Sequence, residues 1–189
     1  MKRNLLKIAA LLSLGVVSPA FAATDGSVGP SSTGTSDLEL IVPKMIQITG
    51  MGNLSATYSP GSDVTMDHDI CIYTNLSSSE SGTYKVVATG NYAADGTAGD
   101  AFYLKRTGTA TTIPYTVKYN DEAGTTNNVA MTAGATHALT GQTGYSNVVN
   151  TACTSGQNAN YQIIIDEDDI LAKFHGTYTG TLTLVVTPE

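Results

Sequence analysis

The sequence contains no tryptophan, and only two of its 189 residues are cysteines. Without tryptophan it cannot have the buried indole that packs on the disulfide of antibody domains. It also lacks a phosphate-binding loop, a dinucleotide-binding fingerprint, a zinc-ligand spacing and a nucleophile elbow. No nucleophile and base stand at a recognisable spacing. These absences predict a protein that is not an enzyme, with no catalytic residue, metal or cofactor.

Positive charge is scarce, with nine lysines and arginines against sixteen aspartates and glutamates. Three of the nine fall within the first seven residues, ahead of a mostly apolar run at 8–17 and a small-x-small site at 20–22. This order predicts a cleaved signal peptide over residues 1–22, because the run is shorter than the roughly 20 apolar residues of a membrane span. The mature chain then carries six basic and sixteen acidic residues. Such a charge argues against nucleic acid as a partner.

Cys71 and Cys153 form an even pair behind the expected signal peptide. In an oxidising compartment such a pair predicts one disulfide. The bond would close a loop of about 80 residues and stabilise the fold by roughly 4 kcal/mol. A metal site is disfavoured, because the sequence has no C-x-x-C and no histidine at the usual spacing from either cysteine.

Short runs of alternating apolar and polar residues, separated by turn residues, fill most of the chain. The clearest run is 176–189, where Tyr178, Leu182, Leu184 and Val186 share one parity. We expect it to be a central or near-central strand. Other expected strands are 70–73 with 84–89 as a hairpin, 102–104, 113–119, 129–131 and 161–165, and one or two helical turns are expected at 168–174. The pattern predicts an all-β fold, an immunoglobulin-like β-sandwich, with a jelly roll as the alternative.

The beginning of the mature chain divides into two parts. Residues 23–36 are mostly Gly, Ser and Thr and are expected to be flexible, whereas 37–189 is expected to be one domain. Apolar residues then alternate on both sides of Pro43, namely Leu38, Leu40, Val42, Ile46 and Ile48. Two interpretations stay open for this run. It is either the first strand of its own domain or a strand donated to another molecule.

Three polar or aromatic features have functional alternatives. The carboxylates at 166–169 could hold calcium, but their spacing favours a solvated turn with Asp168 or Asp169 capping a short helix. His68 lies between two aspartates, and we interpret it, like His137 and His175, as a surface histidine rather than a base. The ten tyrosines could form a glycan-binding surface, yet Tyr84, Tyr115, Tyr119 and Tyr178 fall on core parities, which favours packing.

Four stretches of the mature chain are characteristic when taken with the signal peptide. They are L-E-L-I-V-P-K-M-I-Q-I, then C-I-Y-T-N before S-G-T-Y-K-V-V-A-T-G, then N-T-A-C-T-S-G-Q-N-A-N-Y, and the ending H-G-T-Y-T-G-T-L-T-L-V-V-T-P-E. Together they resemble exported bacterial pilin-type subunits of the spore-coat-U-like or archaic chaperone–usher sort. The likeness covers most of the mature chain.

The resemblance implies an incomplete immunoglobulin-like sandwich that lacks one strand. In such proteins a periplasmic chaperone fills the gap, and the N-terminal segment of the next subunit replaces it during assembly at an outer-membrane usher. The implied function is a structural subunit of a surface fimbria, or pilus, that passes through the periplasm and has identical or related subunits as partners. The alternative is a secreted or surface adhesin that binds a host or surface glycan.

The sequence departs from this family at the expected donor segment. A donor strand needs alternating apolar residues ahead of its domain, and 23–36 has almost none. Either the donor is the run from Leu38 to Ile48, or the sandwich is complete and does not exchange strands.

Overall fold

The computed structural model describes residues 23–76, 83–137 and 141–189, so the expected signal peptide lies outside the described residues. The chain divides into two units, Met1–Val42 and Pro43–Glu189. In the first unit, Thr24 and Thr35 exchange two backbone hydrogen bonds of 3.0 and 2.9 Å. The second, compact unit begins six residues later than the expected domain start at Asp37.

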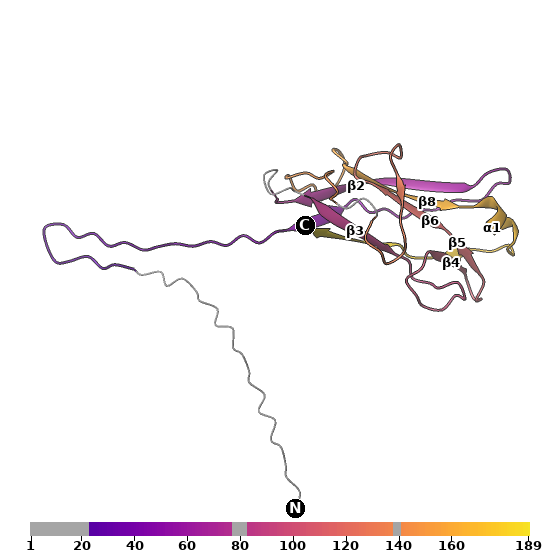
Figure 1. The fold of residues 1–189 in the computed structure, drawn as a ribbon, viewed down its shortest axis with the longest axis horizontal. Coiled ribbons are helices and arrows are strands. Elements are labelled where there is room, and N and C mark those ends of the chain that lie inside the picture. The colour runs from indigo at the N-terminus through magenta and orange to yellow at the C-terminus, as the bar shows by residue number, and fades with distance from the viewer. Residues whose placement is uncertain (1–22, 77–82, 138–140) are drawn as a thin grey trace, which may run out of the picture. The chain divides into compact units, whose positions relative to one another are not determined.

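The described part of the compact unit consists of short strands and one short helix (Figure 1). In chain order these are β1 (Ile46–Thr49), β2 (Val64–Thr74), β3 (Tyr84–Thr89), β4 (Tyr103–Arg106), β5 (Thr112–Pro114), β6 (Thr116–Asn120), β7 (Val129–Ala130), β8 (Ala159–Ile165), α1 (Glu167–Leu171), β9 (Tyr178–Thr179) and β10 (Thr183–Pro188). No helix in the described residues is long and apolar enough to cross a membrane.

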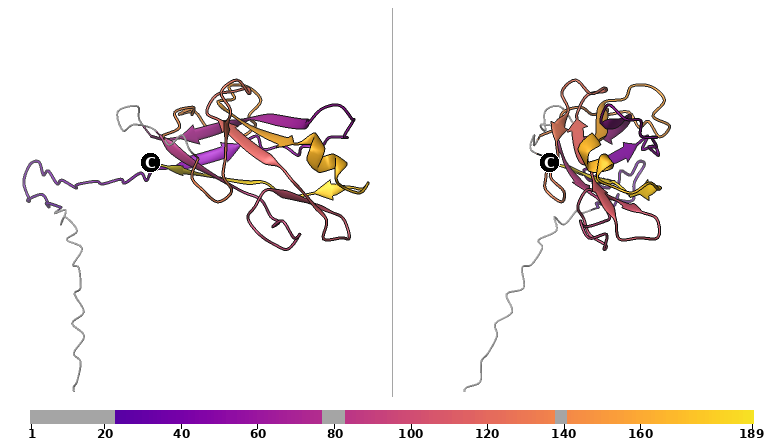
Figure 2. Two further views of the ribbon diagram at one scale, coloured as in Figure 1. Left: turned by 45° about the vertical axis from the view of Figure 1, so that its right-hand side comes forward. Right: turned by 90° about the vertical axis from the view of Figure 1, so that its right-hand side faces the viewer.

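The strands pair antiparallel into two layers, as the sequence predicts for a β-sandwich (Figures 1 and 2). One layer is a five-stranded sheet in the order β1-β2-β8-β6-β7, and the other contains the sheets β5-β4-β9 and β10-β3. Alternation along the strands turns one face of each inward; in β3, for example, Tyr84, Val86 and Ala88 are buried. The core lies between the layers and is mostly aliphatic and tyrosine side chains.

The terminal run is two strands at a sheet edge and not one central strand. β9 pairs with β4, whereas β10 pairs only with β3. The switch occurs at Gly180, where a Cβ atom would lie 3.0 Å from the Leu104 side chain and 3.1 Å from the Tyr103 oxygen. The next amide, that of Thr181, donates to the Asn91 side chain at 2.9 Å instead of to a strand. Leu184 is buried, and Tyr178, Leu182 and Val186 pack against the core as half-buried residues.

Two other sequence expectations are wrong in their pairing. The run 113–119 is divided between β5 and β6, which belong to different sheets, because the chain crosses between layers at Pro114 and Tyr115. β3 does not form a hairpin with the end of β2; it pairs with β10, from Tyr84 opposite Pro188 to Thr89 opposite Thr183. In both cases the alternation identifies a buried face correctly but carries no information about the partner strand.

Helix α1 and His137 also differ from expectation. The N-cap of α1 is Asp166, whose side chain accepts a hydrogen bond from the Asp168 amide at 2.9 Å, and neither Asp168 nor Asp169 takes that role. His137 is not a surface residue, because only 2% of it is exposed and its ring packs edge-on against Tyr119 at 5.6 Å. Its burial follows from the loop backbone, since its amide donates to the Val86 oxygen at 2.7 Å.

Candidate strand-binding groove

An apolar groove of about 990 Å³ opens into the core of the compact unit. It runs between two stretches of chain, residues 51–58, here called the first wall, and residues 173–182, the second wall. Its floor is made of side chains from both layers, namely Val64, Met66, Leu104, Ile113, Tyr115, Tyr161, Ile163, Ile165 and Ile170. Because the floor residues belong to both layers, the groove is a gap in the sandwich and not a depression in one sheet.

The first wall follows β1 but leaves the sheet. β1 pairs with β2 as far as Thr49 opposite Cys71, and β2 extends seven residues beyond that point, to Val64. At Gly50 the chain takes a φ of 82°, which favours glycine, and the described residues 51–58 form no strand. Side chains hold the wall in place: the Tyr161 hydroxyl donates to the Gly52 oxygen at 3.0 Å. The wall is therefore a short edge that lies outside the sheet, with Leu54 packed against the core.

The second wall leads into an edge strand. It contains β9 and Gly180, and β10 begins at Thr183. β10 is bonded to β3 along one edge, and no strand among the described residues pairs with its other edge. A strand placed between the two walls would cover the apolar floor and complete the sandwich. Because both walls present backbone hydrogen-bonding groups to the groove, the occupant that fits it is an extended strand rather than a compact ligand.

The chemistry of the groove favours an apolar strand. Its lining includes one lysine, Lys173, and one histidine, His175, and no aspartate or glutamate, in a chain with sixteen acidic residues. At the α1 end the apolar surface continues outward through Leu171 and Phe174, which are 63% and 72% exposed. A strand with apolar side chains on alternate positions would bury this surface on one face and leave its other face in solvent.

The far end of the first wall is fixed by a carboxylate. The Tyr58 hydroxyl and the Gly61 amide each donate to Glu167 Oε1 at 2.6 Å. The hydrogen bond from Tyr58, followed by that from Gly61, holds the pKa of Glu167 below its usual value of 4.5. The same bond, more than burial, raises the pKa of Tyr58 to about 12.

We predict that this attachment weakens in acid. A lowered folded-state pKa means that Glu167 contributes stability above its usual pKa of 4.5, and this contribution is lost as the pH falls through the lower folded value. In Glu167→Gln the dependence on pH over this range should be smaller. Hydrogen exchange of residues 57–61 between pH 6 and pH 3, corrected for intrinsic exchange rates, measures the effect. An equal acid loosening in both proteins would contradict the assignment.

The structure separates the residues of the predicted donor run. Ile46 and Ile48 lie in β1, opposite Thr74 and Ile72, and pack against the core of their own domain. For these two residues the structure has the arrangement of the first interpretation, a strand of their own domain. Leu38, Leu40 and Val42 precede the compact unit and are 93%, 87% and 61% exposed. These three, with Glu39 and Ile41 between them, are called the arm (residues 38–42) below.

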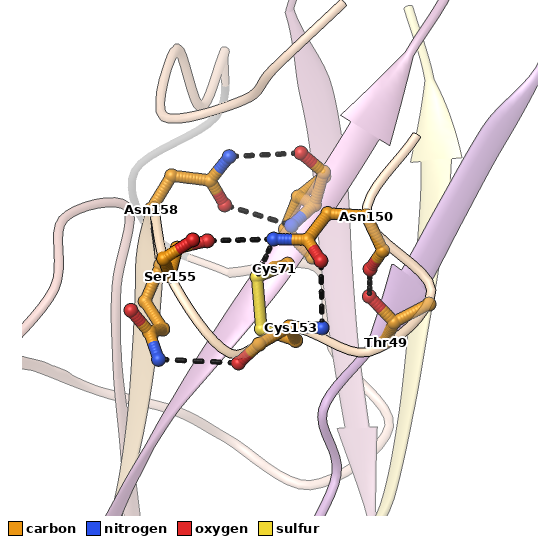
Figure 3. The surroundings of a disulfide bond; sticks show 8 residues. Thr49, Cys71, Asn150, Cys153, Ser155 and Asn158 are labelled. Atoms are coloured by element: carbon orange, nitrogen blue, oxygen red, sulfur yellow. Dashed lines mark hydrogen bonds between the residues drawn. A yellow bond between two sulfur atoms is a disulfide. The ribbon is translucent and has the colours of Figure 1, made fainter. Parts of the chain in front are cut away.

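The predicted disulfide between Cys71 and Cys153 is present, with the Cα atoms 5.6 Å apart and 82 positions apart in sequence (Figure 3). It ties β2 to the loop that precedes β8. The side chain of Asn150 organises this loop: its oxygen accepts from the Cys153 amide at 2.8 Å, and its nitrogen donates to the Ser155 oxygen at 2.6 Å. The bond lies beside the end of β1 and the start of the first wall.

The polar residues singled out from the sequence have structural partners. Asp69 accepts from the Gly124 amide at 2.7 Å and from the Asn160 side chain at 2.8 Å. His68 packs near Tyr161, with ring centres 6.1 Å apart, and His175 lines the groove. Among the described residues, no group of three His, Cys, Asp or Glu side chains is placed to hold a metal. The resemblance implied a sandwich that lacks one strand, but nothing in the sequence indicated which residues would line the groove, because its walls are 115 positions or more apart and only the fold brings them together.

Neither a protein-family model nor a curated protein matches the sequence. A solved structure reported as "Chaperone-tip adhesin complex is vital for synergistic activation of CFA/I fimbriae biogenesis" matches with 20% identity and a TM-score of 0.51. The match covers 76% of this chain and 41% of the other, so this chain spans less than half of that protein. At this identity the likeness concerns the fold alone. In its fold the chain resembles a fimbrial β-sandwich.

Proposed function

We propose that the protein is a structural subunit of a surface fimbria in which the arm of one copy fills the groove of the next. The observation that carries this proposal is the groove, an apolar gap that opens into the core between two backbone edges to which no strand of the described residues is added. The arm offers a matching ligand, because Leu38, Leu40 and Val42 share one parity and are exposed. Backbone hydrogen bonds would supply affinity, and the three side chains would set the register.

Chain geometry favours donation to another copy over insertion of the arm into its own domain. If the arm folded back on β1 through residues 43–45, Val42 would lie opposite Ile46 and Leu40 opposite Ile48. Leu38 would then lie opposite Gly50, one residue before the first wall begins at Met51. The apolar residues of the arm therefore fall short of their own groove, whereas the groove of a second copy has no such restriction.

The two ends of the compact unit support head-to-tail assembly. Lys44 Nζ donates to the backbone oxygen of Glu189 at 2.7 Å, so the unit begins beside its C-terminal residue. Helix α1, beside which the groove ends, lies at the opposite end of the unit (Figures 1 and 2). An arm that leaves one end of a subunit and a groove that is entered from the other generate a linear chain of copies.

The open groove also indicates which proteins the subunit would bind before assembly. Before assembly the open groove exposes core residues and strand edges, which favour aggregation. We propose that a periplasmic chaperone lends a strand to the groove and that an outer-membrane usher directs the exchange to the next subunit. The location proposed is the periplasm during export and the cell surface after assembly.

The test is assembly of the purified mature protein with and without a competing peptide. We expect multimers that resist SDS until boiled, and a shift to monomers when a synthetic peptide of residues 36–44 is present in excess during refolding. A control peptide with serine at positions 38, 40 and 42 should leave the multimers unchanged. A protein that stays monomeric under all conditions, or multimers that ignore both peptides, would contradict the proposal.

A further inference from the structure

The start of the first wall lies against the disulfide. Gly50 joins β1 to the wall, and a Cβ atom built on it would lie 2.7 Å from both the Cβ and the Sγ of Cys153. Its φ of 82° is one that residues with a side chain rarely adopt. The disulfide therefore occupies the space beside Gly50, the residue at which the chain leaves the sheet and turns toward the groove.

The loop that carries Cys153 is attached to the same point. The Thr49 hydroxyl donates to the backbone oxygen of Asn150 at 2.7 Å, and the side-chain oxygen of Asn150 accepts from the Cys153 amide. Cys153 has a φ of 46°, a left-handed conformation that is uncommon for a residue other than glycine. Thr49 also lies opposite Cys71 in the β1–β2 ladder. Both cysteines thus converge on the two residues that precede the first wall.

The wall itself has few other attachments. Among the described residues, 51–58 form no strand. Two side-chain hydrogen bonds hold the wall, from Tyr161 to the Gly52 oxygen and from Tyr58 to Glu167. Between them Leu54 packs against the core, and Gly52 lies against the His68 ring. A segment that is not paired in a sheet takes its direction from whatever fixes the residue that precedes it. Here that is Gly50, confined between β1 and the disulfide.

We infer that the Cys71–Cys153 disulfide is a positioning element of the groove: through Gly50 it sets the place of the first wall and hence the width available to an incoming strand. This inference rests on the proposed function. It assigns the disulfide a role in strand binding that is separate from its contribution to the stability of the whole domain. Gly50 is the residue that transmits this role, because its missing side chain lets the bridge pack directly on the backbone.

The test compares the mature protein with the variant Cys71→Ala/Cys153→Gly. Glycine at 153 keeps the φ of 46° without strain and removes the atoms that contact Gly50. We expect residues 51–58 to exchange amide hydrogens at least tenfold faster in the variant, while β3 and β8 keep their protection. We also expect the peptide of residues 36–44 to bind at least tenfold more weakly.

A second pair of variants keeps the test decisive if the first one folds poorly. Gly50→Ala places a methyl group against the bridge in the oxidised protein, whereas Gly108→Ala meets nothing within 4 Å at a similar φ of 75°. Only Gly50→Ala should weaken peptide binding. This effect should largely disappear when Gly50→Ala is combined with Cys71→Ala/Cys153→Gly. A general loss of stability would instead give additive effects of the substitutions on peptide binding.

The outcomes separate the inference from the proposed function. Unchanged exchange of residues 51–58 and unchanged peptide binding without the disulfide would overturn the inference and leave the proposed function intact. Failure of the oxidised wild-type protein to bind the peptide would overturn the proposed function, while the exchange rates would still show whether the bridge positions the wall. Equal effects of Gly50→Ala and Gly108→Ala would also overturn the inference.

Discussion

Leu40→Asp is expected to abolish multimers of the mature protein while leaving the melting temperature of the compact unit unchanged. Leu40 lies outside that unit and is 87% exposed, so the substitution removes no contact from the folded domain. In an assembled chain the same side chain would enter a groove whose floor is apolar, and a carboxylate there costs several kcal/mol. Unboiled SDS gels and light scattering measure assembly, and a thermal melt of the monomer measures the domain.

Ile41→Asp is the matched control for this prediction. Ile41 is also in the arm and is 76% exposed, but it lies on the opposite parity and would face away from the groove floor. Multimers should persist in Ile41→Asp at near wild-type yield. A lower melting temperature in monomeric Leu40→Asp would show that the arm belongs to its own domain. Equal loss of assembly in both variants would contradict the proposal that only one parity of the arm faces the groove.

Alternation in the sequence identified buried faces well and strand partners poorly. The expected strand at 84–89 agrees with β3, and its alternate residues Tyr84 and Val86 are fully buried. The same signal continued without a break across Pro114 and across Gly180, where the chain changes sheets. A side chain that stays on the inner face of a sandwich keeps its parity when the backbone crosses from one layer to the other. Parity therefore cannot reveal the crossing.

The residues that line the groove were beyond prediction from the sequence for a related reason, although the resemblance implied a missing strand. A missing strand leaves no residues in the sequence to detect, and the two walls are distant in the chain. One partial signal existed, since the alternating run from Leu38 to Ile48 is interrupted by Pro43. The structure uses the part after the proline as β1 and leaves the part before it exposed. Burial of His137 had no signal of this kind, because it results from a loop that pairs with β3.

Ile48→Asp is expected to have the opposite effect to Leu40→Asp, although both residues belong to one alternating run. Ile48 lies in β1 opposite Ile72 and packs on the core, so aspartate there loses apolar burial and places a carboxylate against the core. A loss of about 3 kcal/mol would lower the melting temperature of a domain of this size by roughly 6–12 °C.

The matched control for Ile48→Asp is Gln47→Asp, one residue earlier in the same strand and on its exposed face, which should change the melting temperature little. Thermal unfolding of the three monomeric proteins followed by circular dichroism decides the matter. A stable Ile48→Asp monomer that fails only in assembly would return Ile48 to the donated segment and move the start of the domain beyond β1.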